Sequence, residues 1–300
     1  MLIEMLVQEY LLDCQVRQLA EKTVAQYSKQ LRYFTNFIEE EFGVTTLEDL
    51  EAKHIKSYIR HLQGRRNKPT YINDLIKPVK CACTYAYQEG YTDTVITKRI
   101  KNLKEGKTLI HTFSGDEISR LIKYFNGKDF LSVRNRLILM ILFDTGIRVN
   151  ELITMKEKQI RSGYIVICGK GNKERVVPLN AMVGKYMLKY KAERMQYFAL
   201  KETQDYYFLS KNGKKLTNSG ISKFLKDAAE AVHVNSNVRV SPHTCRHSFA
   251  QQSLKNGLDI YSLSRILGHE SVTVTQRYLA SIQDEQILGA VRQTSVLSHL

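Results

Sequence analysis

Residues 241–250 read SPHTCRHSFA, and this stretch is the most informative part of the sequence. On a helix, His243 and Arg246 lie three positions apart and share one face, with His247 one position further on. A guanidinium never loses its charge, and its planar fork matches the oxygens of a phosphate. The stretch therefore points to chemistry at a phosphate group, for which it needs partners from elsewhere in the chain.

Cleavage of a phosphodiester gathers negative charge on the non-bridging oxygens of a pentavalent transition state. A second guanidinium suits that charge, and the reaction also needs a nucleophile, a proton acceptor for it and a proton donor for the leaving 5′ oxygen. Arg148 is the candidate for the second guanidinium. It lies in TGIRVNEL at 145–152, directly after a predicted buried helix, and Glu151 can orient it. Taken alone, Arg148 would be a surface arginine at the start of a helix.

The other candidates follow along the chain. Lys170 is expected at the tip of a glycine-flanked hairpin, from which a lysine can reach a DNA groove and donate a proton. Its GKGNK sequence lacks the spacing of a nucleotide-binding P-loop. Gly268 and His269 are predicted to end a helix over 259–267, and Tyr278 follows. Taken alone, Lys170 would be a solvated turn residue and Tyr278 one of 17 tyrosines.

A zinc site is the alternative interpretation of the histidines. Its ligands would be His243, Cys245, His247 and His269. Cys245 would point away from the face that carries the first two histidines, and no clustered cysteine or acidic residue completes the set. The sequence therefore predicts no metal site, and it predicts no other cofactor.

The charge balance indicates the class of partner. With 45 lysines and arginines against 30 acidic residues, the chain carries a net charge of +15, which favours association with polyanions. A basic protein without any nucleic-acid role would be about as consistent with composition alone. An anionic membrane surface is a third alternative, but no basic amphipathic helix supports it.

The cysteines and the apolar runs indicate the compartment. Five scattered cysteines favour a reducing cytosol over a disulfide framework. The N-terminus lacks the features of a signal peptide, and the longest apolar run, over 137–143, is far too short to span a membrane. A soluble, cytoplasmic protein is expected.

Apolar periodicity predicts helices throughout the first hundred residues. Over 23–40, Val24, Tyr27, Leu31, Phe34 and Phe37 recur at steps of three and four, which is typical of one helix face. Further helices are predicted over 52–63 and, apart from Pro78, over 71–89.

The second half mixes helices with a small sheet. A capping box of Ser114 and Glu117 predicts a helix start, and a buried helix is predicted over 134–143. The hairpin strands are predicted over 164–168 and 175–179, with 206–209 as a third strand. The remainder is expected to be helical.

Together these stretches resemble the tyrosine recombinases of the phage integrase family. The matching pieces are TGIRVNEL at 145–152, GKGNKERVVPL at 169–179, SPHTCRHSFA at 241–250 and LGHESVTVTQRY at 267–278. They look most like the Xer resolvases and the short integrases of transposons and conjugative elements. The order and spacing of the pieces make the resemblance specific.

The resemblance implies a fold that is mainly α with a small β-sheet, arranged as a two-domain DNA clamp. A helical, SAM-like core-binding domain is expected over 1–104, a basic linker over 105–111 and an α+β catalytic domain over 112–300. The tail after Tyr278 is expected to dock on a neighbouring subunit.

The resemblance also implies the roles of the site residues. Arg148 and Arg246 would clamp the scissile phosphate, Lys170 would protonate the departing 5′ oxygen, and Tyr278 would form a 3′-phosphotyrosyl bond. His243 and His269 would complete the charge and proton network.

The implied function is site-specific DNA recombination: integration, excision or dimer resolution. The partners would be double-stranded DNA with inverted core half-sites and further subunits, as a dimer on one site and a tetramer in the synapse, or a second recombinase. The alternatives are a DNA-relaxing enzyme of the type IB topoisomerase kind and a DNA-binding accessory protein without catalysis.

Overall fold

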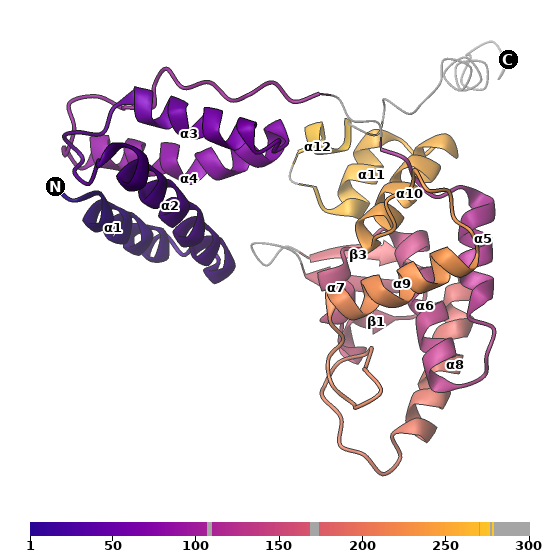
Figure 1. Cartoon of the computed structure of the whole chain (residues 1–300). Coiled ribbons are helices and arrows are strands. Elements are labelled where there is room, and N and C mark those ends of the chain that lie inside the picture. Colours follow the sequence, from indigo (N-terminus) through magenta and orange to yellow (C-terminus); the bar gives the residue numbers. More distant parts are fainter. Residues whose placement is uncertain (107–109, 169–173, 270, 277, 279–300) are drawn as a thin grey trace, which may run out of the picture. The chain divides into compact units, whose positions relative to one another are not determined.

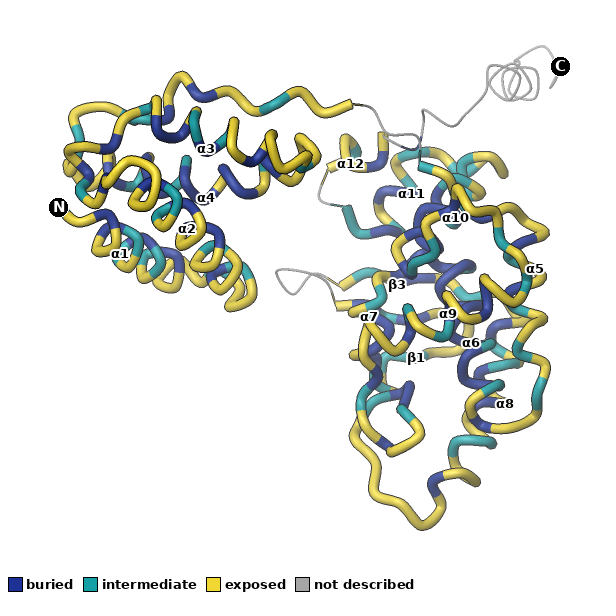
Figure 2. The backbone as a smooth tube through the Cα atoms, viewed as in Figure 1, coloured by how far each residue is buried: buried dark blue, intermediate teal, exposed yellow. Residues whose placement is uncertain are grey.

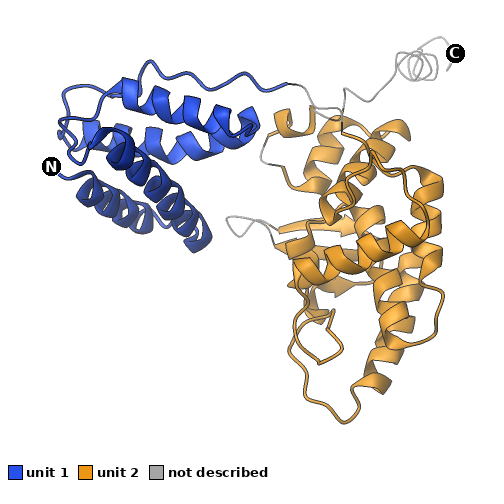
Figure 3. Cartoon of the chain, viewed as in Figure 1, with its two compact units in different colours: residues 1–108 blue, residues 109–300 orange. Residues whose placement is uncertain are grey.

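The computed structural model describes residues 1–106, 110–168, 174–269, 271–276 and 278 (Figure 1). Lys170 and the expected docking tail lie outside these residues. The chain divides into two compact units, residues 1–108 and 109–300 (Figure 3), and each is described by itself. Within the described ranges, no helix combines the length and the apolar character needed to cross a membrane.

The described residues of unit 1 form helices around one apolar core. The helices are α1 (Ile3–Val16), α2 (Glu21–Phe42), α3 (Ala52–Gly64) and α4 (Pro69–Gln88). Helix α2 contains the predicted 23–40 segment, and Val24, Leu31 and Phe34 are buried as their spacing predicts. The helical interpretation of this half is confirmed.

Helix α4 differs from its prediction at both prolines. It begins at Pro69 and not at residue 71, because a proline in the first turn has a suitable fixed φ and lacks only an N–H that would have no helical partner. Pro78 lies inside the helix and does not end it. Burial of Pro78 in the core of unit 1 offsets the loss of one backbone hydrogen bond.

Unit 2 packs helices around a small sheet. Its helices before the sheet are α5 (Gly115–Tyr124), α6 (Phe130–Thr145), α7 (Val149–Ile153) and the 3₁₀ turn η1 (Glu157–Gln159). The strands are β1 (Ile160–Arg161), β2 (Tyr164–Cys168) and β3 (Glu174–Pro178). The helices after the sheet are α8 (Ala181–Tyr197), α9 (Asn218–Ala231), α10 (Pro242–Lys255), α11 (Ile260–Leu267) and α12 (Thr273–Gln276).

Helix α6 forms the centre of unit 2. Figure 2 shows it largely in the colour of buried residues, and it packs against α8 and α10. The side chain of Asp129 caps its first turn by accepting from the N–H groups of Leu131 and Ser132. Helix α5 has the predicted capping box, in which Ser114 and Glu117 each accept from the other's backbone N–H. These caps set where the helices begin.

The sheet has the antiparallel order β1-β2-β3. Ile165 pairs with Val177, and both are fully buried, so one face of the hairpin covers the core. The prediction of a strand over 206–209 is wrong: that segment makes only a single bridge, from Leu209 to Lys215, and β1 is the third strand. The apolar run at 206–209 supplies core side chains instead, because it packs between α8 and the end of α7.

Candidate active site

The junction of α6 and α7 positions Arg148. Helix α6 ends at Gly146, whose φ of +59° is readily adopted only by a residue without a side chain. A Cβ at Gly146 would lie 2.3 Å from Cδ1 of Phe249 on α10, so the glycine also allows α10 to approach. Arg148 follows as the N-cap of α7, with its side chain 45% exposed.

Glu151 holds Arg148 at two points. The backbone N–H of Arg148 donates to Oε2 of Glu151 at 2.7 Å, and its Nη1 donates to Oε1 at 3.0 Å. Burial alone would raise the pKa of Glu151, but the hydrogen bonds and charges of Arg175 and Arg148 outweigh it and hold that pKa below its ordinary value. Glu151 is therefore a carboxylate at neutral pH, as its predicted orienting role requires.

Helix α10 places Arg246 inside the protein. Only 3% of the residue is exposed, and its Nη1 donates to the carbonyl of Gly146 at 2.8 Å. Its Nη2 donates to the carbonyl of Leu267 at 2.7 Å. Burial, together with the positive charge of Arg148, lowers the pKa of Arg246 to about 10, so the guanidinium remains charged at neutral pH.

His269 joins the same cluster through Arg246. Its Nε2 lies 3.0 Å from Nη2 of Arg246, and its Nδ1 lies 2.8 Å from Oγ1 of Thr275. Because a guanidinium only donates, the contact with Arg246 suits a tautomer in which Nε2 accepts and Nδ1 carries the proton that faces Thr275.

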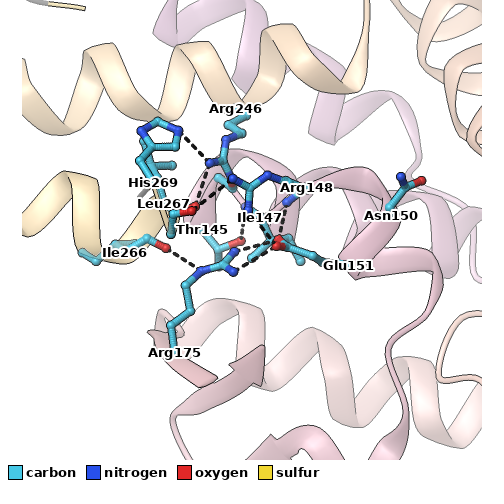
Figure 4. A network of polar contacts seen from close by, with 12 residues as sticks. Thr145, Ile147, Arg148, Asn150, Glu151, Arg175, Arg246, Ile266, Leu267 and His269 are labelled. Carbon is cyan, nitrogen blue, oxygen red and sulfur yellow. Dashed lines mark hydrogen bonds and ion pairs between the residues drawn. The ribbon is translucent and has the colours of Figure 1, made fainter. Parts of the chain in front are cut away.

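Three arginine side chains lie at the end of α11. Figure 4 shows the side chains of Arg148, Arg175 and Arg246 directed at this end. Nη2 of Arg148 donates to the carbonyl of Gly268 at 3.1 Å, next to the carbonyl of Leu267 that Arg246 binds. The last carbonyls of a helix lack partners within the helix and form the negative end of its dipole, so they suit cations.

Tyr278 is fully buried beside α10. Its side chain packs with Ala250, Leu263 and Leu267, and its hydroxyl lies 2.9 Å from Nδ1 of His247. His247 directly follows Arg246 in the chain. The tyrosine hydroxyl therefore lies close to the arginine cluster but is enclosed by protein.

His243 is exposed at the start of α10, and its ring meets that of His247 edge-on with centroids 4.3 Å apart. Lys170 lies outside the described residues. The structure thus brings Arg148, Arg246 and His269 into direct or shared contact, with Tyr278 held nearby.

The geometry of Cys245 argues against a zinc site on α10. The thiol is fully buried, and its Sγ lies 3.5 Å from the carbonyl of Ser241. Burial raises the pKa of Cys245, which opposes the thiolate that zinc would require. Among the residues that the structure describes, no three His, Cys, Asp or Glu side chains are grouped to hold a metal ion.

Sequence reasoning missed two residues of this network. From the sequence, His247 is only a candidate metal ligand, yet it contacts Tyr278. Arg175 was considered only as part of a strand, yet it binds Glu151. Alternation along β3 offered a signal, since Arg175 shares a face with the buried Val177, and an inward-facing arginine requires a partner.

The chain belongs to the phage integrase family, whose family model matches residues 111–285. A model of the phage integrase SAM-like domain matches residues 5–102. The chain is thus a tyrosine recombinase, as its motifs predicted.

Individual relatives show which proteins of this family the chain is similar to. The tyrosine recombinase XerD of Halalkalibacterium halodurans is 29% identical over 264 residues, which cover 87% of this chain and 88% of the relative. The solved structure of XerH bound to a palindromic difH substrate matches with a TM-score of 0.77 and 20% identity, over 92% of this chain and 81% of that one. A lambda integrase tetramer bound to a Holliday junction matches with a TM-score of 0.70 and 18% identity, over 93% and 77%. The structural matches show a shared fold, mainly helical with a small sheet.

Proposed function

We propose that this recombinase exchanges DNA strands by attack of Tyr278 on a phosphate held by Arg148 and Arg246. The observation that carries the proposal is that the two guanidiniums are fixed on neighbouring carbonyls at the end of α11, those of Gly268 and Leu267. Fixed charges stabilise a transition state because they need no reorganisation when negative charge develops.

Each group in the site has one task in the proposed reaction. The phenolic oxygen of Tyr278 passes its proton to the histidine network and forms a bond to phosphorus while the bond from phosphorus to the 5′ oxygen breaks. Lys170 donates a proton to that oxygen, and His243 and His269 complete the charge and proton network. The free 5′ hydroxyl of a partner strand then attacks the phosphotyrosyl bond and releases Tyr278. Phosphodiester bonds are conserved in number, so no nucleotide hydrolysis is required.

Tyr278 must leave its present position to react. A fully buried hydroxyl cannot reach a phosphate on a DNA duplex, and here it contacts His247. In the proposed mechanism, the described conformation is the one before cleavage. Movement of Tyr278 away from His247 is a step of the proposed mechanism.

The proposed substrate is double-stranded DNA with inverted core half-sites. The net charge of +15 suits such a polyanion, and the palindromic substrate of XerH has this symmetry. We propose a dimer on one site and a tetramer in the synapse, as lambda integrase forms on a Holliday junction, with a second recombinase as the alternative partner. Such a DNA substrate and the scattered cysteines support a cytoplasmic location.

A covalent-trapping experiment tests the nucleophile. The core site is first obtained by selecting bound duplexes from a random-sequence pool, and a nick beside the cleavage position then traps the covalent product. The wild-type chain should form an adduct that survives denaturing electrophoresis, whereas Tyr278→Phe should bind the same DNA and form none. Adduct formation by Tyr278→Phe would remove Tyr278 from the mechanism.

A second experiment addresses the topoisomerase alternative. The relatives named above are recombinases and integrases, which favours strand exchange. Plasmids with and without the selected core site are compared: the proposal requires recombination that depends on the site. Relaxation of both plasmids at equal rates, without exchange, would support the alternative.

A further inference from the structure

Arg175 makes the most complete set of contacts of the three arginines at this site. It lies in β3, where its backbone pairs with Ile167 of β2. Its Nη1 and Nη2 donate to the two carboxylate oxygens of Glu151 at 2.9 and 2.7 Å, and its Nε donates to the carbonyl of Ile266 at 2.8 Å. All three nitrogens of the guanidinium are therefore bound to two other elements, α7 and α11 (Figure 4).

Glu151 connects Arg175 to Arg148. Its Oε1 accepts from Nη1 of both arginines, and its Oε2 accepts from Nη2 of Arg175 and from the backbone N–H of Arg148. The side chains of Glu151 and Arg175 are only 12% and 11% exposed, whereas that of Arg148 is 45% exposed. The buried pair thus supports the more exposed arginine.

Three consecutive carbonyls at the end of α11 each receive one guanidinium. Those of Ile266, Leu267 and Gly268 accept from Arg175, Arg246 and Arg148, in that order. A Cβ at Gly268 would lie 3.0–3.1 Å from Cδ, Nη1 and Nε of Arg175, so the chain leaves just enough room for this side chain. Arg175 is therefore built into the same frame as the two phosphate-binding arginines.

The charges explain why Arg175 is needed beside Glu151. If Arg175 were neutral, the carboxylate would attract Arg148 with nothing to offset it, and both of its oxygens would be available to that one guanidinium. With Arg175 bound in a fork, the negative charge of Glu151 is largely matched before a phosphate arrives. Arg148 can then be oriented by Glu151 and still use its charge on the DNA.

We propose that Arg175 is a positioning residue for strand cleavage, which acts through Glu151 on Arg148 and ties β3 to the end of α11. The proposal rests on the function proposed above. Arg175 itself does not touch the phosphate.

Single-turnover cleavage of the nicked core-site duplex tests the proposal. Arg175→Met removes the charge and the fork, and it should lower the cleavage rate of bound DNA roughly 10- to 100-fold, because small displacements of a catalytic group are costly. Arg175→Lys keeps the charge without the fork and should lie between Arg175→Met and wild type. Affinity for the duplex should change little, since the side chain of Arg175 is only 11% exposed.

A double variant separates positioning from general damage. If Arg175 acts through Arg148, then Arg148→Ala with Arg175→Met should cleave no more slowly than Arg148→Ala alone. A methylphosphonate at the scissile position removes the charge that Arg148 stabilises, so the defect of Arg175→Met should also shrink on that substrate. If the two substitutions multiply their effects, or if the defect is the same on both substrates, the proposal is wrong.

Arg161 provides the matched control. It is an exposed arginine of the same sheet, and the contact described for its side chain is to its own strand's carbonyl at Ile160. Arg161→Met should leave cleavage of bound DNA unchanged. If Arg175→Met fails to fold, the same comparisons are made with Arg175→Lys. Cleavage by Arg175→Lys at the wild-type rate would show that the two-point contact with Glu151 is not needed, and the proposal would be wrong. Failure of the proposed function would appear separately, as an adduct formed by Tyr278→Phe.

Discussion

The hydroxyl of Tyr278 lies 2.9 Å from Nδ1 of His247, and the tyrosine is fully buried. This contact should stabilise the free protein, because a buried hydroxyl without a partner is costly. We expect a coupling of about 0.5–1.5 kcal/mol between the two side chains in a cycle of Tyr278→Phe, His247→Ala and the double variant. Urea unfolding of the four proteins measures it, and purely additive effects would show that the contact contributes nothing.

Substitution of Arg148 and of Arg246 should affect protein stability differently, although the proposed mechanism needs both arginines for cleavage. Either substitution to Ala should reduce cleavage by the equivalent of roughly 3–4 kcal/mol, in line with the loss of other groups that stabilise a transition-state oxyanion. Only Arg246→Ala should also clearly destabilise the protein, because Arg246 is buried on two carbonyls and Arg148 is largely exposed. Adduct yield and thermal unfolding are measured together. Equal unfolding temperatures for the two variants would contradict the prediction that only the buried Arg246 clearly stabilises the fold.

Lys170 is predicted to protonate the leaving oxygen. Lys170→Ala should cleave the natural duplex slowly, because an alkoxide is a poor leaving group. A 5′-phosphorothiolate duplex releases a thiolate, which needs no proton, so the rate of the variant should recover in part on this substrate. Arg148→Ala is the control and should show no such recovery, since its defect concerns the non-bridging oxygens. Absence of recovery for Lys170→Ala would assign the proton to another group.

Glu151 should make stability depend on pH in the acid range. Its pKa is lower in the folded protein than its ordinary value, so its contribution is complete above that ordinary value and is lost as the pH falls through the folded pKa. At neutral pH, Glu151→Gln should cost up to roughly 3–5 kcal/mol, the loss found for fully buried pairs, because it removes the charged partner of the mostly enclosed Arg175. Urea unfolding of both proteins from pH 7 downwards gives the difference. A difference that does not shrink in acid would mean that the ion pair is not its source.

Gly146 should be far less tolerant of a side chain than Gly43. Both end a helix with a positive φ, of +59° and +65°, so alanine at either costs about 1–2 kcal/mol of backbone strain. At Gly43 nothing lies within 4 Å of the added carbon, but at Gly146 it would clash with Phe249. Gly146→Ala should therefore be the more destabilising and should also impair cleavage, because the Gly146 carbonyl holds Arg246. Equal unfolding temperatures would contradict the close approach of α10.

Some of the site could be predicted from residue types and spacing. The break at Gly146, the start of α5 at Ser114 and the end of α11 at Gly268 are local events that caps and glycines decide. The third strand was predicted wrongly at 206–209, because an apolar run reads the same whether it pairs in a sheet or fills a core. β1, with two residues, is too short for alternation to reveal.

The sequence by itself determined the helices of unit 1 and the hairpin of unit 2. Its motifs were also specific enough to identify a tyrosine recombinase. Only the tertiary structure decided how these residues meet. No spacing predicts that three guanidiniums bind consecutive carbonyls of α11, or that Tyr278 is enclosed against His247. Such contacts join residues about 20 to 120 positions apart, and they depend on how helices and strands pack, whereas caps, turns and periodicity depend only on near neighbours in the chain.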